Sequence, residues 1–389
     1  MENFIYHSPT KVIFGRGGEN DVGRHIKQAG GSRVLLVTGG GSAERSGLLG
    51  RVRDSLENEG LFSKTLTGVK PNPLLSKVHE GIDTARQNDI DFVLAVGGGS
   101  TIDTAKAISI GAVYDGDVWD FYAGRATPEK GLLHANIVTI AAAGSETSAS
   151  SVITNEQGGL KYGLTCELYR PLFTIMNPEL CYTLPAYQTA CGAVDIVMHT
   201  LERFFSYGES RLTDRIAAAV VETAMEAAEI CLKRPDDYDA RGELFWAGSL
   251  SHNDLTGVGR TGSPQRAGDW SCHQLEHELS AEYGVAHGAG LAAVFGAWAN
   301  YVKDVWPERF IQIGERLFGA KTPKGAIDGF LAFFKRIGMP VNIKELLGRA
   351  LTDDEIKLLA EKCSRGRSRT IGVFKQLDYN DMLNIYKMA

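Results

Sequence analysis

Three apolar segments in the first half of the sequence each run directly into small residues. They are RVLLVTGGG at 33–41, FVLAVGGG at 92–99 and ANIVTIAAAG at 135–144, and stretches with helical spacing separate the first two. Short apolar runs that alternate with helices predict a parallel sheet covered by helices. Glycine-rich turns at the ends of such strands lie where these sheets bind ligands. The first half is therefore predicted to be an α/β dinucleotide-binding domain.

The pattern changes after Pro185. Segments at 186–206, 212–233 and 236–253 have helical spacing, and runs of β-branched residues disappear. The sequence thus predicts an α/β domain at 1–185 and an all-helical domain at 186–389. At the N-terminus, FIYHSP and KVIFG are predicted to form an edge pair of strands, and exposed edges tend to pair with another chain.

Composition excludes several classes of protein. The 41 basic and 47 acidic residues give a net charge of −6, so the basic face that binds nucleic acid is not expected. The N-terminus lacks the features of a signal peptide. The uncharged stretch at 283–302 contains four glycines and is predicted to be a buried helix rather than a membrane span. Six scattered cysteines without a CxxC pair predict reduced thiols and a cytoplasmic location.

The turn after the second apolar run carries the strongest phosphate-binding signal. Three glycines at 97–99 end a strand and precede a helical segment. Bare amides at the start of a helix bind anions, which suits a pyrophosphate, and Ser100 or Thr101 is predicted to cap the helix. Asp103 and Lys106 follow, within reach of ligand or of neighbouring backbone. A plain strand-to-helix turn is the alternative interpretation.

Two further turns are candidates for the same ligand, at 39–42 after the first strand and at 139–148 after the third. None of the three is a GxGxxG motif, so the common dinucleotide fingerprint is absent. A polar loop is the alternative for the third.

Enzymes that prefer NAD commonly place a carboxylate after the first strand, where it binds the 2′-hydroxyl of the ribose. Here Gly40, Gly41 and Ser42 occupy that place and no acid precedes Glu44, which predicts a preference for NADP(H) over NAD(H).

Aspartate and histidine recur at helical spacing in the second half. Asp195 and His199 are four residues apart, so both lie on one helix face, and His273 and His277 repeat that spacing. With His287, an Asp and His set of this kind suits a divalent transition metal with a position open for substrate. The alternative for Asp195 and His199 is a pair on a helix surface, and the alternative for His287 is a packed core histidine. The letters HQLEH also fit the HxxEH motif of zinc hydrolases, with Glu276 as base.

These residues resemble the iron-containing (group III) alcohol dehydrogenases, within them the butanol dehydrogenase and aldehyde reductase branch. The resemblance covers nearly the whole chain, and it includes GVKPNP at 68–73, GGGSTIDTAK at 97–106, GSET at 144–147, ITNE at 153–156, and the DxxxH and HxxxHx(9)H patterns. It implies the dehydroquinate synthase-like fold and a homodimer. By position it assigns the metal to Asp195, His199, His273 and His287, a non-ligand active-site role to His277, the pyrophosphate to Gly97, Gly98, Gly99, Ser100 and Thr101, and the rest of the cofactor to Thr139, Ser148 and Lys161.

The chain departs from the family pattern in three places. The usual TGSE or TGTE turn reads AAGSE at 142–146, the usual PHG reads AHG at 286–288, and 262–268 resembles a short insertion.

The predicted reaction is the reversible oxidation of a primary alcohol to an aldehyde. A metal, Fe²⁺ or Zn²⁺, would act as Lewis acid, hydride would pass to the nicotinamide, and His277 would carry the proton. A lyase of the dehydroquinate synthase type is the main alternative.

Overall fold

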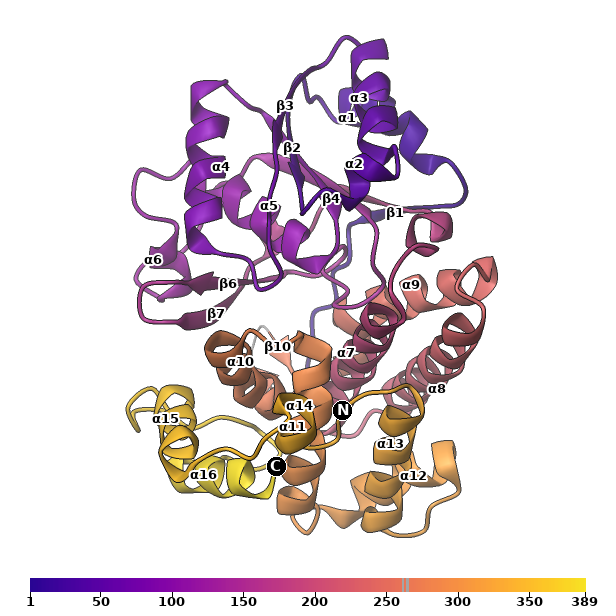
Figure 1. Ribbon diagram of the computed structural model, residues 1–389, viewed down its shortest axis with the longest axis vertical. Coiled ribbons are helices and arrows are strands. Elements are labelled where there is room, and N and C mark those ends of the chain that lie inside the picture. The colour runs from indigo at the N-terminus through magenta and orange to yellow at the C-terminus, as the bar shows by residue number, and fades with distance from the viewer. Residues whose placement is uncertain (261, 264–265) are drawn as a thin grey trace. The chain divides into compact units, whose positions relative to one another are not determined.

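The computed structural model describes residues 1–260, 262–263 and 266–389 of the 389-residue chain (Figure 1). These residues form two compact units. The first, here called the α/β unit, comprises 7–183 and 236–245. The second, the helical unit, comprises the described residues of 1–6, 184–235 and 246–389.

A six-stranded sheet forms the centre of the α/β unit. Its strand order is β1-β8-β5-β4-β2-β3, and every neighbouring pair is parallel. The central strands read as continuous apolar runs because helices cover both of their faces. The strands are β1 (Lys11–Phe14), β2 (Arg33–Thr38), β3 (Phe62–Leu66), β4 (Phe92–Gly97), β5 (Leu133–Val138) and β8 (Phe173–Met176).

Helices cover this sheet on both sides, as Figure 1 shows. On one face, Val34 and Leu36 of β2 share a buried core with Val52 and Leu56 of α3. Each such fully buried aliphatic side chain contributes about 1.5–3 kcal/mol to folding. Helices α4 and α5 pack together, and α5 lies against β4, β5 and β2. The helices are α1 (Val22–Gln28), α2 (Ser42–Arg45), α3 (Leu48–Asn58), α4 (Leu75–Gln87), α5 (Gly99–Gly111) and α6 (Trp119–Tyr122), with 3-10 turns at Gly18–Asp21, Glu167–Tyr169 and Pro178–Cys181.

Two local predictions are wrong. Residues 4–9 form no strand, so there is no N-terminal hairpin, and β1 instead pairs in parallel with β8, Lys11 opposite Phe173. Helix α5 begins at Gly99 with Gly98 as its N-cap and has no side-chain cap, so Ser100 and Thr101 lie inside its first turn. A separate antiparallel hairpin, β6 (Ser150–Asn155) and β7 (Leu160–Thr165), follows the third glycine-containing turn.

The helical unit confirms the predicted all-α character of the second half. Its described exceptions are the two-residue strands β9 (Gly262–Ser263) and β10 (Arg266–Ala267) and an isolated bridge between Ile371 and Leu377. The expected insertion at 262–268 lies partly outside the described residues. The helices are α7 (Ala186–Phe204), α8 (Arg211–Lys233), α9 (Tyr238–His252, which contributes to both units), α10 (Ser271–Tyr283), α11 (His287–Val302), α12 (Pro307–Phe318), α13 (Pro323–Arg336), α14 (Ile343–Leu347), α15 (Asp353–Cys363) and α16 (Tyr379–Met388), with a 3-10 turn at Leu255–Gly257.

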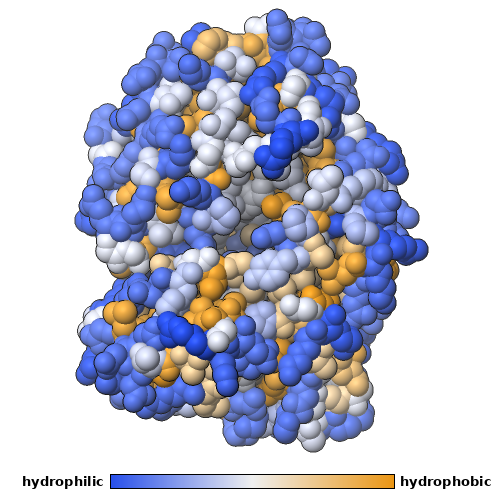
Figure 2. Space-filling model, viewed as in Figure 1, coloured by the Kyte–Doolittle hydropathy of each residue, from blue (hydrophilic) through white to orange (hydrophobic). Residues whose placement is uncertain are grey.

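The apolar stretch predicted as a buried helix is α11. Leu291, Phe295 and Trp298 are almost completely buried, together with most of its other residues. Figure 2 shows hydrophilic side chains over most of the visible face, with apolar ones in smaller patches. Among the described residues, no helix has the length and apolar character needed to span a membrane.

Candidate functional site

Helix α7 carries the first half of the Asp and His set. Asp195 and His199 lie one turn apart on the same face, as their spacing predicts, and both are buried. His199 Nε2 approaches Asp195 Oδ1 to 3.6 Å. Burial, reinforced by the positive charges that neighbouring histidines would carry, holds the pKa of His199 well below its usual value. His199 is therefore a neutral imidazole, which is the form that binds a metal.

Helices α10 and α11 bring in the other histidines. His273 lies in the first turn of α10, and His287 is the first residue of α11. Helix α11 packs directly against the backbone of α7. A Cβ built on Gly288 would lie only 2.0 Å from the carbonyl oxygen of Cys191, so no larger residue fits there. Glycine at 288 thus permits the close helix contact that brings His287 to Asp195.

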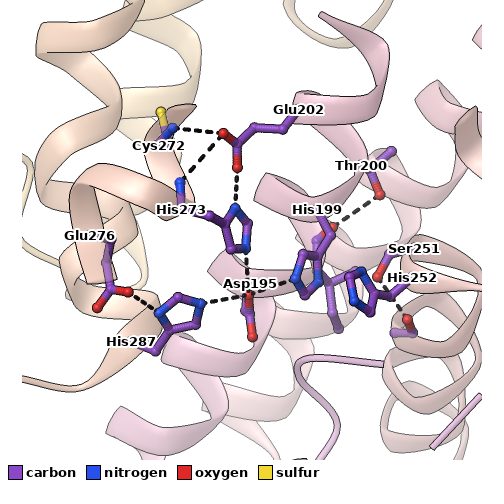
Figure 3. Close-up of polar contacts among 12 residues, drawn as sticks. Asp195, His199, Thr200, Glu202, Ser251, His252, Cys272, His273, Glu276 and His287 are labelled. Carbon is purple, nitrogen blue, oxygen red and sulfur yellow. Dashed lines mark hydrogen bonds and ion pairs between the residues drawn. The ribbon is translucent and has the colours of Figure 1, made fainter. Parts of the chain in front are cut away.

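Three imidazole nitrogens converge on one carboxylate oxygen (Figure 3). Nε2 of His199, His273 and His287 lies 3.6, 3.6 and 3.7 Å from Asp195 Oδ1. Two donors bound to one ion at about 2.1 Å with near-tetrahedral angles lie about 3.4 Å apart. Asp195 Oδ1 and His273 Nε2 are also buried without a hydrogen-bond partner in the described part of the chain. The donor set therefore fits a single divalent ion.

Two buried glutamates accept hydrogen bonds from these histidines. Glu202 of α7 is bound to Nδ1 of His273, and Glu276 of α10 is bound to Nδ1 of His287. Both carboxylates are completely buried. Burial would lower the pKa of His273, but the charges of Glu202 and Asp195 raise it to about 9. Sequence reasoning missed Glu202, and it considered Glu276 as a hydrolase base, as a group behind the ligands or as a surface residue.

His252 and Trp270 were also missed. The His252 ring stacks on His199 with 4.0 Å between ring centroids, and Trp270 lies edge-on to His199, His252 and His273. Arg203 donates to His252 Nδ1 at 3.2 Å and lies over the Trp270 ring. Trp270 has a left-handed backbone, with φ of 62°. For an aromatic residue this conformation is unfavourable and is retained only where packing enforces it.

His277 lies apart from the convergent nitrogens. It is buried one turn beyond His273 in α10, and its ring centroid is 6.5 Å from that of His273 and 5.7 Å from that of His287. Donor atoms of Glu276, His277 and His287 lie within 4.8 Å of one another, as do those of Asp195, His273 and His287. The first of these sets is already engaged, because the Glu276 carboxylate is bound to His287 and to Ser280. The hydrolase interpretation needs Glu276 free to act on water.

The three glycine-containing turns lie together at the carboxyl edge of the sheet. Thr38 of β2 is opposite Val96 of β4, and Gly97 is opposite Val138 of β5. From β2 the chain continues outward to β3, whereas from β4 it continues in the other direction to β5. The point between β2 and β4 is therefore a topological switch point, where open α/β sheets bind ligands.

The glycines of these turns are required for different reasons. A Cβ on Gly97 would lie 2.5 Å from the Thr101 hydroxyl, and one on Gly98 would lie 2.9 Å from Ile140, so the protein's own packing requires glycine there. Gly41 has a φ of 96°, which favours glycine. Gly40 has no atom within 4 Å of an added Cβ. Among the glycines at 39–41 and 97–99, Gly40 alone has open space where a Cβ would lie.

The remaining predicted cofactor residues surround the third turn. Thr139 donates its amide to the carbonyl of Gly97 at 3.0 Å. The Ser148 hydroxyl lies 3.2 Å from Nζ of Lys106, so it serves the buried lysine. Lys161 is buried in β7, opposite Thr154. Asp103 accepts from the Ser145 hydroxyl at 2.6 Å and from the Val152 amide at 2.9 Å, so Asp103 and Lys106 bind neighbouring protein groups.

Comparisons with known proteins agree with this architecture. The family model described as iron-containing alcohol dehydrogenase matches residues 9–178, and the model of the C-terminal region of the Fe-containing family matches residues 189–389. The chain is 37% identical to NADH-dependent butanol dehydrogenase A of Clostridium acetobutylicum and 30% identical to the NADPH-dependent aldehyde reductase YqhD of Escherichia coli, with 100% of each chain covered. The crystal structure of NADH-dependent butanol dehydrogenase A from Thermotoga maritima matches with a TM-score of 0.95 at 38% identity, covering 100% of this chain and 99% of that one.

The chain therefore belongs to the iron-containing alcohol dehydrogenase family. Within that family it falls in the butanol dehydrogenase-like branch, and it is an alcohol dehydrogenase. The predicted fold class and family resemblance are confirmed. Neither the lyase nor the hydrolase alternative is needed.

Proposed function

We propose that the enzyme transfers hydride reversibly between a primary alcohol and NAD(P)⁺, with one Fe²⁺ or Zn²⁺ held by Asp195, His199, His273 and His287. The convergence of three imidazole nitrogens at 3.6–3.7 Å from Asp195 Oδ1 carries this proposal. When bound, the ion supplies Lewis acidity that polarises the substrate oxygen. The buried Asp195 carboxylate would offset part of the ion's charge, and the Nε2 atoms of the three histidines would provide the remaining donors.

We assign proton transfer to His277. It lies one turn from His273 but outside the group of nitrogens around Asp195 Oδ1, so it is not one of the proposed metal ligands. Histidine is the side chain that most often serves as a general acid or base. His277 would take the alcohol proton while the hydride leaves carbon.

For the cofactor, we propose that residues 1–185 bind the dinucleotide at the switch point and that residues 186–389 bind the metal. Gly40, Gly41 and Ser42 would contact the adenosine end, and Gly97–Gly99 with Ser100 and Thr101 the pyrophosphate. Thr139, Ser148 and Lys161 would line the remainder. Amides at the start of α5 provide the positive end of a helix dipole for the phosphates.

We propose further that NADP(H) is preferred over NAD(H). The first acid that follows this turn in the sequence, Glu44, is paired with Arg53 at 3.0 Å, while the Arg45 guanidinium lies next to Gly41, 3.1 Å from where a Cβ would be. This environment attracts a 2′-phosphate rather than repelling it. The names of the relatives divide on this point, because the butanol dehydrogenases are NADH-dependent and YqhD is NADPH-dependent.

We also propose a cytoplasmic homodimer. All six cysteines are free thiols, which suits a reducing compartment. Strand β1 is one of the two edge strands of the sheet, and the N-terminal segment exposes apolar side chains, with Ile5 at 97% and Phe4 at 52% of their surface. An open sheet edge and exposed apolar side chains each favour pairing with a second copy.

One assay tests the central proposal. Metal-reconstituted protein is mixed with butyraldehyde and NADPH or NADH, and cofactor oxidation is followed by absorbance with and without a chelator. We expect turnover that the chelator abolishes and that Fe²⁺ or Zn²⁺ restores. Turnover that persists after complete metal removal would contradict the proposed metal chemistry.

A further inference from the structure

His273 is held from its far side by a carboxylate that is also bound to the start of its own helix. One oxygen of Glu202 accepts from Nδ1 of His273. The other accepts from the amide of Cys272 at 2.7 Å and that of His273 at 3.4 Å. Amides in the first turn of a helix have no partner within the helix, and the N-cap residue Trp270 supplies no side-chain bond to α10. Glu202 of α7 thus caps α10 and orients its histidine.

His287 is held in a parallel way but with a different partner. One oxygen of Glu276 accepts from Nδ1 of His287, and the other accepts from the Ser280 hydroxyl. Space for this carboxylate depends on α11, because a Cβ on Gly290 would lie 2.7 Å from Glu276 Cγ. By contrast, His199 Nδ1 has no hydrogen-bond partner among the described residues. In the described part of the chain, Nδ1 is therefore bound to a carboxylate in two of the three histidines (Figure 3).

We propose that Glu202 and Glu276 are positioning residues that fix the metal affinity of the site, and that Glu202 is the more important of the two. This inference rests on the proposed metal site. Each carboxylate accepts only, so it holds the proton of its histidine on Nδ1 and leaves Nε2 free to bind the ion. Each also adds negative charge behind a ligand, which makes the imidazole a stronger donor.

Replacement by glutamine distinguishes Glu202 from Glu276, because glutamine has one accepting oxygen and one donating NH₂ where glutamate has two accepting oxygens. In Glu202→Gln the side chain has two orientations. If its oxygen accepts from the amides of α10, its NH₂ group faces His273 Nδ1. That arrangement moves the imidazole proton to Nε2, the atom that faces Asp195. The reverse orientation places NH₂ against two amide N–H groups. Neither orientation satisfies both partners.

In Glu276→Gln both partners stay satisfied. The glutamine oxygen accepts from His287, and its NH₂ donates to the Ser280 hydroxyl, which can turn its own proton to the Val285 carbonyl at 3.2 Å. At these two contacts, only the negative charge is lost. Within the about 10–100-fold range typical of such partners, we expect Glu202→Gln near the upper end and Glu276→Gln near the lower end.

The experiment measures the dissociation constant for Zn²⁺ in full-length protein by competition with a chelator, and the absorption spectrum of the Co²⁺-loaded form. Asp269→Asn is the matched control. Asp269 is a buried carboxylate at the same helix start, and it accepts from the amides of Ser271, Val373 and Phe374 rather than from a metal-site histidine. It should lower the melting temperature while Zn²⁺ affinity stays within about threefold of wild type, because no ligand loses its partner.

The expected result is a Zn²⁺ dissociation constant raised about 100-fold in Glu202→Gln and about tenfold in Glu276→Gln, with altered Co²⁺ spectra in both. Wild-type affinity in Glu202→Gln, or equal losses in Glu202→Gln and Asp269→Asn, would overturn the inference. If Glu202→Gln does not fold, Glu276→Gln decides, since an unchanged constant and spectrum there contradict it. His273→Ala tests the premise separately: full Zn²⁺ binding by that variant means that the metal site itself is wrongly assigned.

Discussion

The ammonium group of Lys106 donates a hydrogen bond to the main-chain carbonyl of Ser145 at 2.6 Å, which ties helix α5 to the turn that follows β5. The same nitrogen also binds the carbonyls of Ser148 and Ser150, at 3.0 and 2.9 Å. Burial lowers the pKa of Lys106 to about 8, and nearby Asp103 counteracts this effect. A single side chain thus holds the loop on which two predicted cofactor residues lie.

Replacing this lysine should destabilise the α/β unit. Lys106→Met leaves buried carbonyls without a donor, and each such group costs about 1–3 kcal/mol. We expect the free energy of unfolding, measured by urea titration, to fall by about 3 kcal/mol. Lys27→Met is the control, because Lys27 is exposed and pairs with Glu59 at the surface, where a change of less than about 1 kcal/mol is expected. Equal effects of the two substitutions would contradict a structural role for Lys106.

Acid should destabilise the protein partly through His134. This buried residue of β5 contacts the Tyr169 carbonyl through Nε2 at 3.1 Å, and burial, aided by the charge of Lys106, lowers its pKa to about 4. The unfolded histidine titrates near 6.5. Between these values the unfolded state binds a proton that the folded state does not, so stability falls as pH falls, by about 3 kcal/mol at pH 4.

The variant His134→Gln checks this. Glutamine can still donate to the Tyr169 carbonyl but does not titrate. Urea titrations at pH 6.5, 5.5 and 4.5 should show a shallower loss of stability than in the wild type. Parallel losses in the two proteins would mean that His134 is protonated in the folded state.

The two histidines of the HxxxH pair should differ. We expect His273→Ala to lose the bound divalent metal, as should Asp195→Ala and His199→Ala, while nucleotide binding remains. His277→Ala should retain the metal with kcat depressed about 10²–10⁴-fold, the usual contribution of a general acid or base. Elemental analysis and steady-state rates measure both properties. Metal loss in both histidine variants would instead favour the HxxEH geometry.

Gly40 should be needed for the nucleotide and not for the fold. An alanine methyl there meets no protein atom within 4 Å, so Gly40→Ala should melt like the wild type but bind NADPH on the order of tenfold more weakly. Gly50→Ala is the control, because it too meets open space but lies within α3. Fluorescence titration with NADPH and NADH measures both affinities and tests the proposed NADP(H) preference. Unaltered binding by Gly40→Ala would remove this turn from the cofactor site.

The N-terminal apolar residues should control assembly. We expect a homodimer by light scattering at micromolar concentration, and Ile5→Asp should shift it to monomer because a charge cannot be buried unpaired at an interface. Leu212→Asp changes another exposed apolar residue, 68% exposed on α8, and should leave the dimer intact. A wild-type monomer would refute the proposal.

Sequence patterns located the residues whose spacing is local. The glycine turns and the Asp195/His199 spacing follow from strand and helix periodicity. Within the α/β unit Thr38 lies opposite Val96, and within the helical unit His199 Nε2 lies 3.6 Å from Asp195 Oδ1. The strand predicted at residues 4–9 was wrong because the true partner of β1 is distant in the sequence. Strand β1 pairs with β8, about 160 positions later, a partner that local alternation cannot reveal.

The two glutamates did leave a signal in the sequence. HTLE at 199–202 and HQLE at 273–276 repeat one pattern, with glutamate three residues after a histidine. Each glutamate binds a histidine of another helix rather than the one in its own helix: Glu202 of α7 binds His273 of α10, and Glu276 of α10 binds His287 of α11. The motif therefore gives the residues but not their partners, which depend on how α7, α10 and α11 pack.

The contact between Gly288 and the Cys191 carbonyl has a consequence for redesign. Because main chain meets main chain there, no side chain acts as an adjustable spacer between α7 and α11. An engineer who wishes to change which metal this enzyme accepts can exchange donor atoms at fixed positions. Widening the site by enlarging neighbouring residues would instead force the two helices apart and remove His287 from the ion altogether.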